Sequence, residues 1–103
     1  MPKAIVLMEQ YLDLSERYRV ELKVFEVEKS HKFPEGIKVS FVLLDLFQRQ
    51  PRLLIDNHAP YGFHVHEELP KSKDVRRLLP VTNYVEALDQ FWCLVKEIVR
   101  HEN

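Results

Sequence analysis

The chain has 103 residues with 30% charged and 46% hydrophobic side chains, a composition that supports one domain over residues 1–103. Its formal net charge of -1 excludes a protein that coats nucleic acid through overall positive charge, so any contact with RNA must be local. One cysteine excludes an internal disulfide, and no apolar run is long enough to span a membrane, so we expect a cytoplasmic protein with no membrane contact.

The first half of the chain has the pattern of antiparallel strands. Residues 3–13 carry apolar side chains toward both faces, and the polar segment 13–17 is typical of a hairpin turn into a second strand over 18–28. Within this second strand the apolar alternation changes phase, which predicts a β-bulge near Val24 and Phe25.

Further strands follow after a loop at residues 29–36 that contains Pro and Gly. Residues 37–47 are apolar at alternate positions on one face and, in their second half, on the other face as well. We therefore expect a central strand covered on both sides in that half. Residues 52–57 predict another strand, and residues 63–66 a short edge strand.

The clearest element is a helix over residues 83–101. Asn83 is a good N-cap and Glu86, three residues later, completes a capping-box pattern. We expect Cys93, next to the apolar stripe, to pack in the core. The predicted fold is α+β, an antiparallel sheet of four or five strands with the C-terminal helix packed on one face. The apolar stripe consists of Leu88, Phe91, Trp92, Val95, Ile98 and Val99.

One window concentrates the side chains that could carry chemistry. Asp56, Asn57 and His58 stand just before a turn-like segment, and His64 and His66 stand just after it. Residues at i and i+2 of a strand share a face, so His64 and His66 should point the same way.

Proton transfer is the first use of this window. One imidazole would take the 2'-hydroxyl proton of RNA and another would protonate the leaving oxygen, with Asp56 orienting one ring and Asn57 completing the catalytic set. A cation from the segment 71–77 would neutralise the phosphate. The candidates are Lys71, Lys73, Arg76 and Arg77. This mechanism needs no cofactor.

Two alternatives remain at this point. His64 and His66 could ligate a metal, with His58, Asp56 or Glu67 as a further ligand, although His-x-His alone has many false positives. The plainer interpretation is a structural turn, in which short polar side chains bond nearby backbone groups and the histidines are solvated. Residues 71–77 would then be a solvated loop.

Several segments, in their order and spacing, resemble the TumE family, the toxin half of bacterial and archaeal toxin–antitoxin pairs. The Asp-Asn pair, the Gly-containing loop and the His-x-His pair of that family match Asp56, Asn57, Gly62, His64 and His66. The other matching segments are residues 3–7, 20–27, 30–33 and the closing helix.

This resemblance implies a small toxin that acts on RNA and is held inactive by a cognate antitoxin protein. Together with the histidine window it favours a metal-independent ribonuclease. A hypothesis from another class is a binding or regulatory module that offers an exposed sheet edge to a partner strand. A second copy of the chain, forming a homodimer, is the other candidate for that edge.

Overall fold

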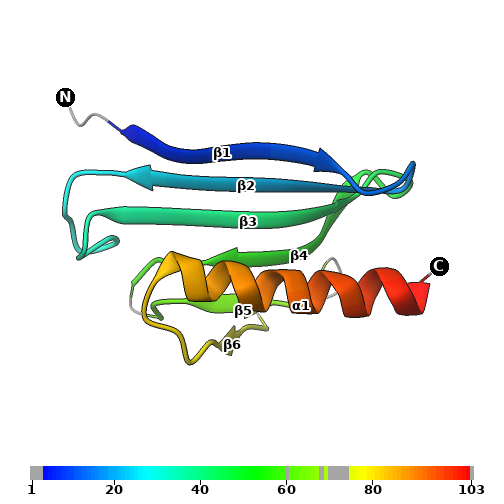
Figure 1. Ribbon diagram of the computed structural model, residues 1–103. Helices are drawn as coiled ribbons and strands as arrows, with labels where there is room; N and C mark the ends of the chain where they lie inside the picture. Colours follow the sequence, from blue (N-terminus) through cyan, green and yellow to red (C-terminus); the bar gives the residue numbers. More distant parts are fainter. Residues whose placement is uncertain (1–3, 60, 68, 70–74, 103) are drawn as a thin grey trace.

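The protein folds as an antiparallel sheet, with one long helix that runs along the direction of the strands on one face (Figure 1). The computed structural model describes residues 4–59, 61–67, 69 and 75–102. The six strands of the described residues lie side by side in chain order, so each strand pairs with the strand that precedes or follows it in the sequence. The elements are β1 Ile5–Asp13, β2 Tyr18–Glu26, β3 Ile37–Asp45, β4 Gln50–Asp56, β5 His64–His66, β6 Arg77–Leu78 and α1 Tyr84–Glu102.

The predicted α+β class is confirmed, and the sheet has one strand more than expected. The extra strand is β6, which pairs with β5 through Leu78 opposite His64 and Arg77 opposite Val65. Two residues are too few for an alternating pattern, so this strand had no signal in the sequence. Among the described residues, no helix is both long and apolar enough to span a membrane.

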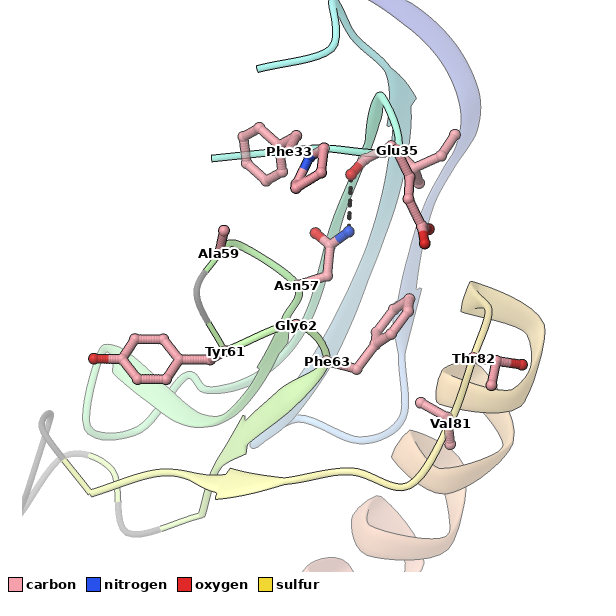
Figure 2. Close-up of a pocket in the computed structure, with 11 residues that line it drawn as sticks. Phe33, Glu35, Asn57, Ala59, Tyr61, Gly62, Phe63, Val81 and Thr82 are labelled. Carbon is pink, nitrogen blue, oxygen red and sulfur yellow. Dashed lines mark hydrogen bonds between the residues drawn. The ribbon is translucent and has the colours of Figure 1, made fainter. Parts of the chain in front are cut away.

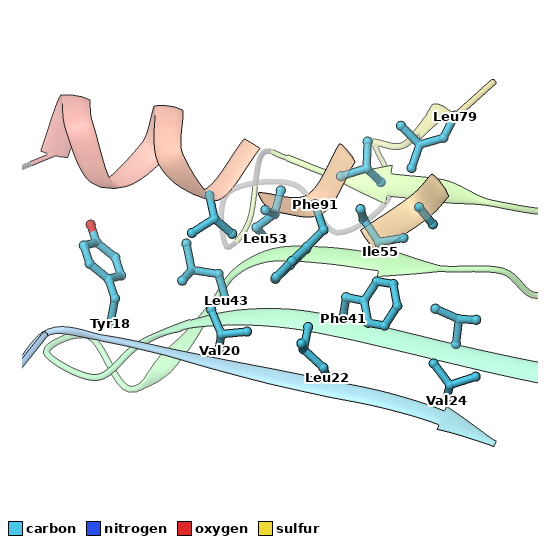
Figure 3. Packing of buried hydrophobic residues seen from close by; sticks show 14 residues of the cluster. Tyr18, Val20, Leu22, Val24, Phe41, Leu43, Leu53, Ile55, Leu79 and Phe91 are labelled. Atoms are coloured by element: carbon cyan, nitrogen blue, oxygen red, sulfur yellow. The ribbon is translucent and has the colours of Figure 1, made fainter. Parts of the chain in front are cut away.

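One face of the sheet carries the hydrophobic core (Figure 3). Every second residue of β2 is buried, and the same face continues across the sheet because Val20 lies opposite Leu43 and Leu43 lies opposite Leu53. The Phe91 ring of α1 lies 5.8 Å from the Phe41 ring of β3.

The opposite face of β3 is only half-buried. Val42 and Leu44, expected to be covered, are of intermediate exposure, whereas Phe41 and Leu43 on the core face are 0% exposed. The prediction of cover on both sides is therefore wrong, because the single helix packs on one face only.

The register between β1 and β2 is interrupted in β1 and not in β2, and a second shift lies between β3 and β4, where Leu43 pairs with Leu53 and Leu44 with Pro51. Between β1 and β2 the register passes from Val6 opposite Phe25 to Met8 opposite Val24, so Leu7 is the extra residue. β2 itself keeps an unbroken register with β3, and Phe25 continues the outward phase. The prediction therefore names the wrong strand, although Val24 and Phe25 lie directly opposite the bulge in β1.

The helix begins as its sequence predicts. The Glu86 backbone N–H donates to the Asn83 side chain at 2.9 Å, and the Glu86 carboxylate accepts from the Thr82 backbone N–H at 2.9 Å. Cys93 is exposed, so its expected place in the core is wrong. It lies on the solvent side because the buried helix positions are Ala87, Phe91 and Val95.

A partly buried ion pair between Arg17 and Asp45 lies at the end of the sheet that carries the β1–β2 and β3–β4 turns. Asp45 of β3 is 2% exposed and accepts from the Arg17 guanidinium at 2.9 Å. It also accepts the backbone N–H groups of Phe47 and Gln48. The Arg17 hydrogen bond holds the pKa of the Asp45 carboxyl below its ordinary value of 3.8, despite burial.

Candidate functional site

The polar window lies at the opposite end of the sheet, where β4 ends and β5 begins. Asp56 pairs with His64 across the two strands, and Leu54 pairs with His66. Ile55 lies in the core, so the alternation places His64 and His66 together on the face turned away from α1. Their rings are 5.0 Å apart, which agrees with the predicted shared face.

Asp56 holds His58 in a fixed orientation. One carboxylate oxygen of Asp56 lies 2.9 Å from His58 Nδ1, and the other accepts the backbone N–H of Asn57 at 2.6 Å. A carboxylate only accepts, so Nδ1 carries the hydrogen and His58 Nε2 is left for other partners. The His58 side chain is 25% exposed and the Asp56 side chain 27%, so His58 is the accessible imidazole of the window.

His64 is the buried imidazole. It is 0% exposed, and its Nδ1 lies 2.7 Å from the carbonyl oxygen of Gly62. Since a carbonyl cannot donate, Nδ1 carries the hydrogen, and Nε2 has a lone pair that no described residue satisfies. Burial lowers the pKa of His64 below its ordinary value of 6.5, although the Gly62 carbonyl opposes this shift, so the ring is neutral at pH 7.

Tyr61 joins the histidines to a cation. Its ring makes edge contacts with His58 at 5.8 Å and with His64 at 5.6 Å. The Arg76 guanidinium lies over the Tyr61 ring, 4.2 Å from its centroid. His58 and His64 are themselves 4.8 Å apart, so the aromatic contacts form one connected cluster.

The four predicted phosphate-binding cations have different outcomes. Lys71 and Lys73 lie outside the described residues. Arg76 reaches the cluster, as described above. Arg77 forms an ion pair with Glu67 at 2.9 Å, so its charge is already partly neutralised.

Asn57, predicted as a catalytic residue, has its carboxamide engaged by the backbone of β3. Its oxygen accepts the Val39 N–H at 2.9 Å and its nitrogen donates to the Ile37 carbonyl at 2.8 Å, the bond drawn dashed in Figure 2. This arrangement ties the end of β4 to β3 and leaves Asn57 as a residue that positions the loop.

A pocket of about 460 Å³ opens beside the window, between the loop before β3, the loop after β4 and the segment before α1 (Figure 2). Its walls are largely apolar and aromatic, and Tyr61 is shared between the pocket and the histidine cluster. No periodic pattern predicts this pocket, because its walls come from loops that are far apart in the chain. The main wall residues are Phe33, Ile37, Tyr61, Phe63 and Val81.

A metal-ligand group also lies in the window. Donor atoms of Asp56, His58 and His64 lie within 4.8 Å of one another. The metal alternative named His64 and His66 with His58, Asp56 or Glu67 as a further ligand. The group in the structure contains His64, His58 and Asp56, which faces His64 across the strand pair, and it lacks His66.

Comparison with protein-family models, with curated proteins and with solved structures finds no match to this chain. The resemblance to the TumE toxins therefore stays a prediction, and the site itself must carry the functional argument.

Proposed function

We propose that the protein is the toxin component of a toxin–antitoxin pair and cleaves RNA by proton transfer between imidazoles. The observation that carries the proposal is the accessible His58, oriented by Asp56, next to the β5 pair His64 and His66. Imidazoles are suited to this reaction because they exchange protons near neutral pH.

His58 takes the role of general base. Its Nε2 would accept the proton of a 2'-hydroxyl while the 2'-oxygen bonds to phosphorus and the bond to the 5'-oxygen breaks. The leaving 5'-oxygen would receive a proton from His66, which is 7% exposed, because His64 is 0% exposed and its ring hydrogen is bonded to the Gly62 carbonyl. The assignment of the base thus moves from the β5 pair to His58, because that ring is the accessible one.

The surroundings supply what an RNA strand needs. Arg76, held over Tyr61, offers a positive charge for the scissile phosphate. The neighbouring pocket offers Phe33 and Phe63 for contact with one nucleobase, and stacking of this kind tolerates any base. A local cation beside an aromatic pocket is consistent with a net charge of -1.

The test is RNA cleavage by untagged protein together with growth arrest on expression of the isolated chain. We expect cleavage to persist in excess chelator, to leave 2',3'-cyclic phosphate ends and to stop at 2'-deoxy positions. The variant His58→Gln and the double variant His64→Ala, His66→Ala should be inactive. The control His101→Gln, at the far end of the helix, should keep full activity.

Equal toxicity of the His58→Gln and wild-type chains would show that this site assignment is wrong. Intact RNA under all conditions, with growth arrest maintained, would remove the ribonuclease and leave a toxin of another kind.

The binding-module alternative also has an observation in its favour. Among the described strands, β1 pairs with β2 only, so its outer backbone groups are unpaired at the sheet edge. Ile5, Val6 and Leu7 of this strand are 56%, 55% and 45% exposed. An edge of this length, with apolar side chains, is suited to the addition of a partner strand.

We propose the cognate antitoxin as that partner. Val6→Lys should weaken the complex, because lysine on an edge strand opposes further pairing, and should leave RNA cleavage unchanged. Co-purification and light scattering of the two chains would measure this. A complex that forms equally well with Val6→Lys would place the antitoxin elsewhere, and a dimer of this chain alone would assign the edge to a second copy.

A further inference from the structure

We propose that Asp56, His58 and His64 form a binding site for one zinc-class transition-metal ion. The site lies where β4 passes through its loop into β5, with Asp56 at the end of one strand and His64 at the start of the next.

The donor atoms are nearly close enough without rearrangement. They lie within 4.8 Å of one another. Around a tetrahedral zinc ion, with bonds of about 2.0–2.2 Å, donor atoms are separated by about 3.4 Å. Binding therefore requires the most distant pair of donor atoms to approach by up to about 1.4 Å. His58, on a loop and 25% exposed, can make that movement.

The buried nitrogen of His64 is the second, independent observation. Nδ1 is committed to the Gly62 carbonyl at 2.7 Å, and Nε2 is fully buried without a hydrogen-bond partner among the described residues. Histidines that ligate metals usually donate their other N–H to a backbone carbonyl or carboxylate, which fixes the tautomer and directs the lone pair at the ion. His64 already has this arrangement.

The donor set determines the class of ion. Two imidazoles and one carboxylate provide nitrogen and oxygen ligands and one negative charge, which suits Zn²⁺ and Co²⁺. Mg²⁺ and Ca²⁺ prefer oxygen ligands throughout.

Metal binding and proton transfer exclude each other at this site. An ion on His58 would occupy the group that we assign as general base, so zinc would inhibit RNA cleavage. This consequence rests on the proposed function, whereas binding of the ion does not.

The test is a zinc titration of full-length, untagged protein in competition with a chromophoric chelator, with cobalt absorption as a second readout. We expect one ion per chain. His58→Gln and Asp56→Asn should each weaken binding by at least about tenfold. The control His101→Gln, which also removes one histidine, should bind as the wild type does.

His58→Gln is the main variant because its side chain is partly exposed, and its fold can be checked by circular dichroism. No retained zinc, or equal binding by His58→Gln and the wild type, would overturn the site. Loss of binding in His101→Gln would do so as well, since that residue lies on the exposed end of α1.

RNA cleavage with and without one equivalent of zinc separates the two proposals. Cleavage that zinc suppresses in the wild type supports both. Zinc binding without RNA cleavage, whether zinc is present or not, would refute the ribonuclease and support the metal site. RNA cleavage by a protein that does not bind zinc would refute the metal site and support the ribonuclease.

Discussion

Removal of the Asn57 side chain would show whether this residue belongs to the fold or to the chemistry. Asn57→Ala deletes two hydrogen bonds to β3, one from the Val39 N–H and one to the Ile37 carbonyl. Each is worth about 1 kcal/mol net, and a backbone group left unpaired adds to the loss, so we expect a decrease of about 2–3 kcal/mol in the free energy of unfolding. For a domain of this size, that corresponds to a fall in Tm of about 10–20 °C.

Urea unfolding followed by circular dichroism measures this change, and RNA cleavage is assayed in parallel at a temperature where the variant is folded. Gln48→Ala is the matched control, since it removes an amide that makes an exposed bond to Gln50 and should change stability by less than about 0.5 kcal/mol. An Asn57→Ala chain as stable as the wild type but inactive would refute the positioning role and restore Asn57 to the catalytic set.

Three further changes test the core, the ion pair and the site. Phe91→Ala removes the central helix anchor and should cost about 3–5 kcal/mol in urea unfolding. The pKa of Asp45 is lower in the folded than in the unfolded chain, so its carboxylate stabilises the fold fully at pH values above the unfolded pKa. This stabilisation is lost as the pH falls, and the free energy of unfolding should decline below about pH 4. Asp45→Asn should remove that part of the decline and cost about 2 kcal/mol at pH 7. His64→Leu should change stability by less than about 1 kcal/mol, because it removes one hydrogen bond together with a buried nitrogen that has no partner among the described residues, yet it should abolish RNA cleavage.

Strand and helix positions were predictable where a period had enough residues to repeat. β2 alternates over nine residues and α1 keeps its stripe over nineteen, and both lie within about two residues of their predicted bounds. The bulge was misplaced because an apolar residue such as Phe25 fits either face of a half-covered sheet, so its phase carries little information.

The candidate site was predictable only where it depends on the alternation of side chains along a strand. Alternation alone placed His64 and His66 on one face. It could not show that Tyr61 lies against His58, that Arg76 covers Tyr61, or that Phe33 contributes to the neighbouring pocket. Those contacts depend on how loops without any period fold back over the sheet, and that is decided by tertiary packing.

A buried polar side chain lies at each end of the sheet, and the two differ in how their polar atoms are paired. Asp45 is buried with its oxygens engaged by Arg17 and two backbone N–H groups, as stability requires. His64 is buried equally deeply, and its Nε2 has no partner among the described residues, which costs about 1–3 kcal/mol. A position under selection for stability alone would carry an apolar side chain there, as its neighbour Val65 does on the core face. The lone pair of His64 Nε2 is the group that the proposed metal site would use.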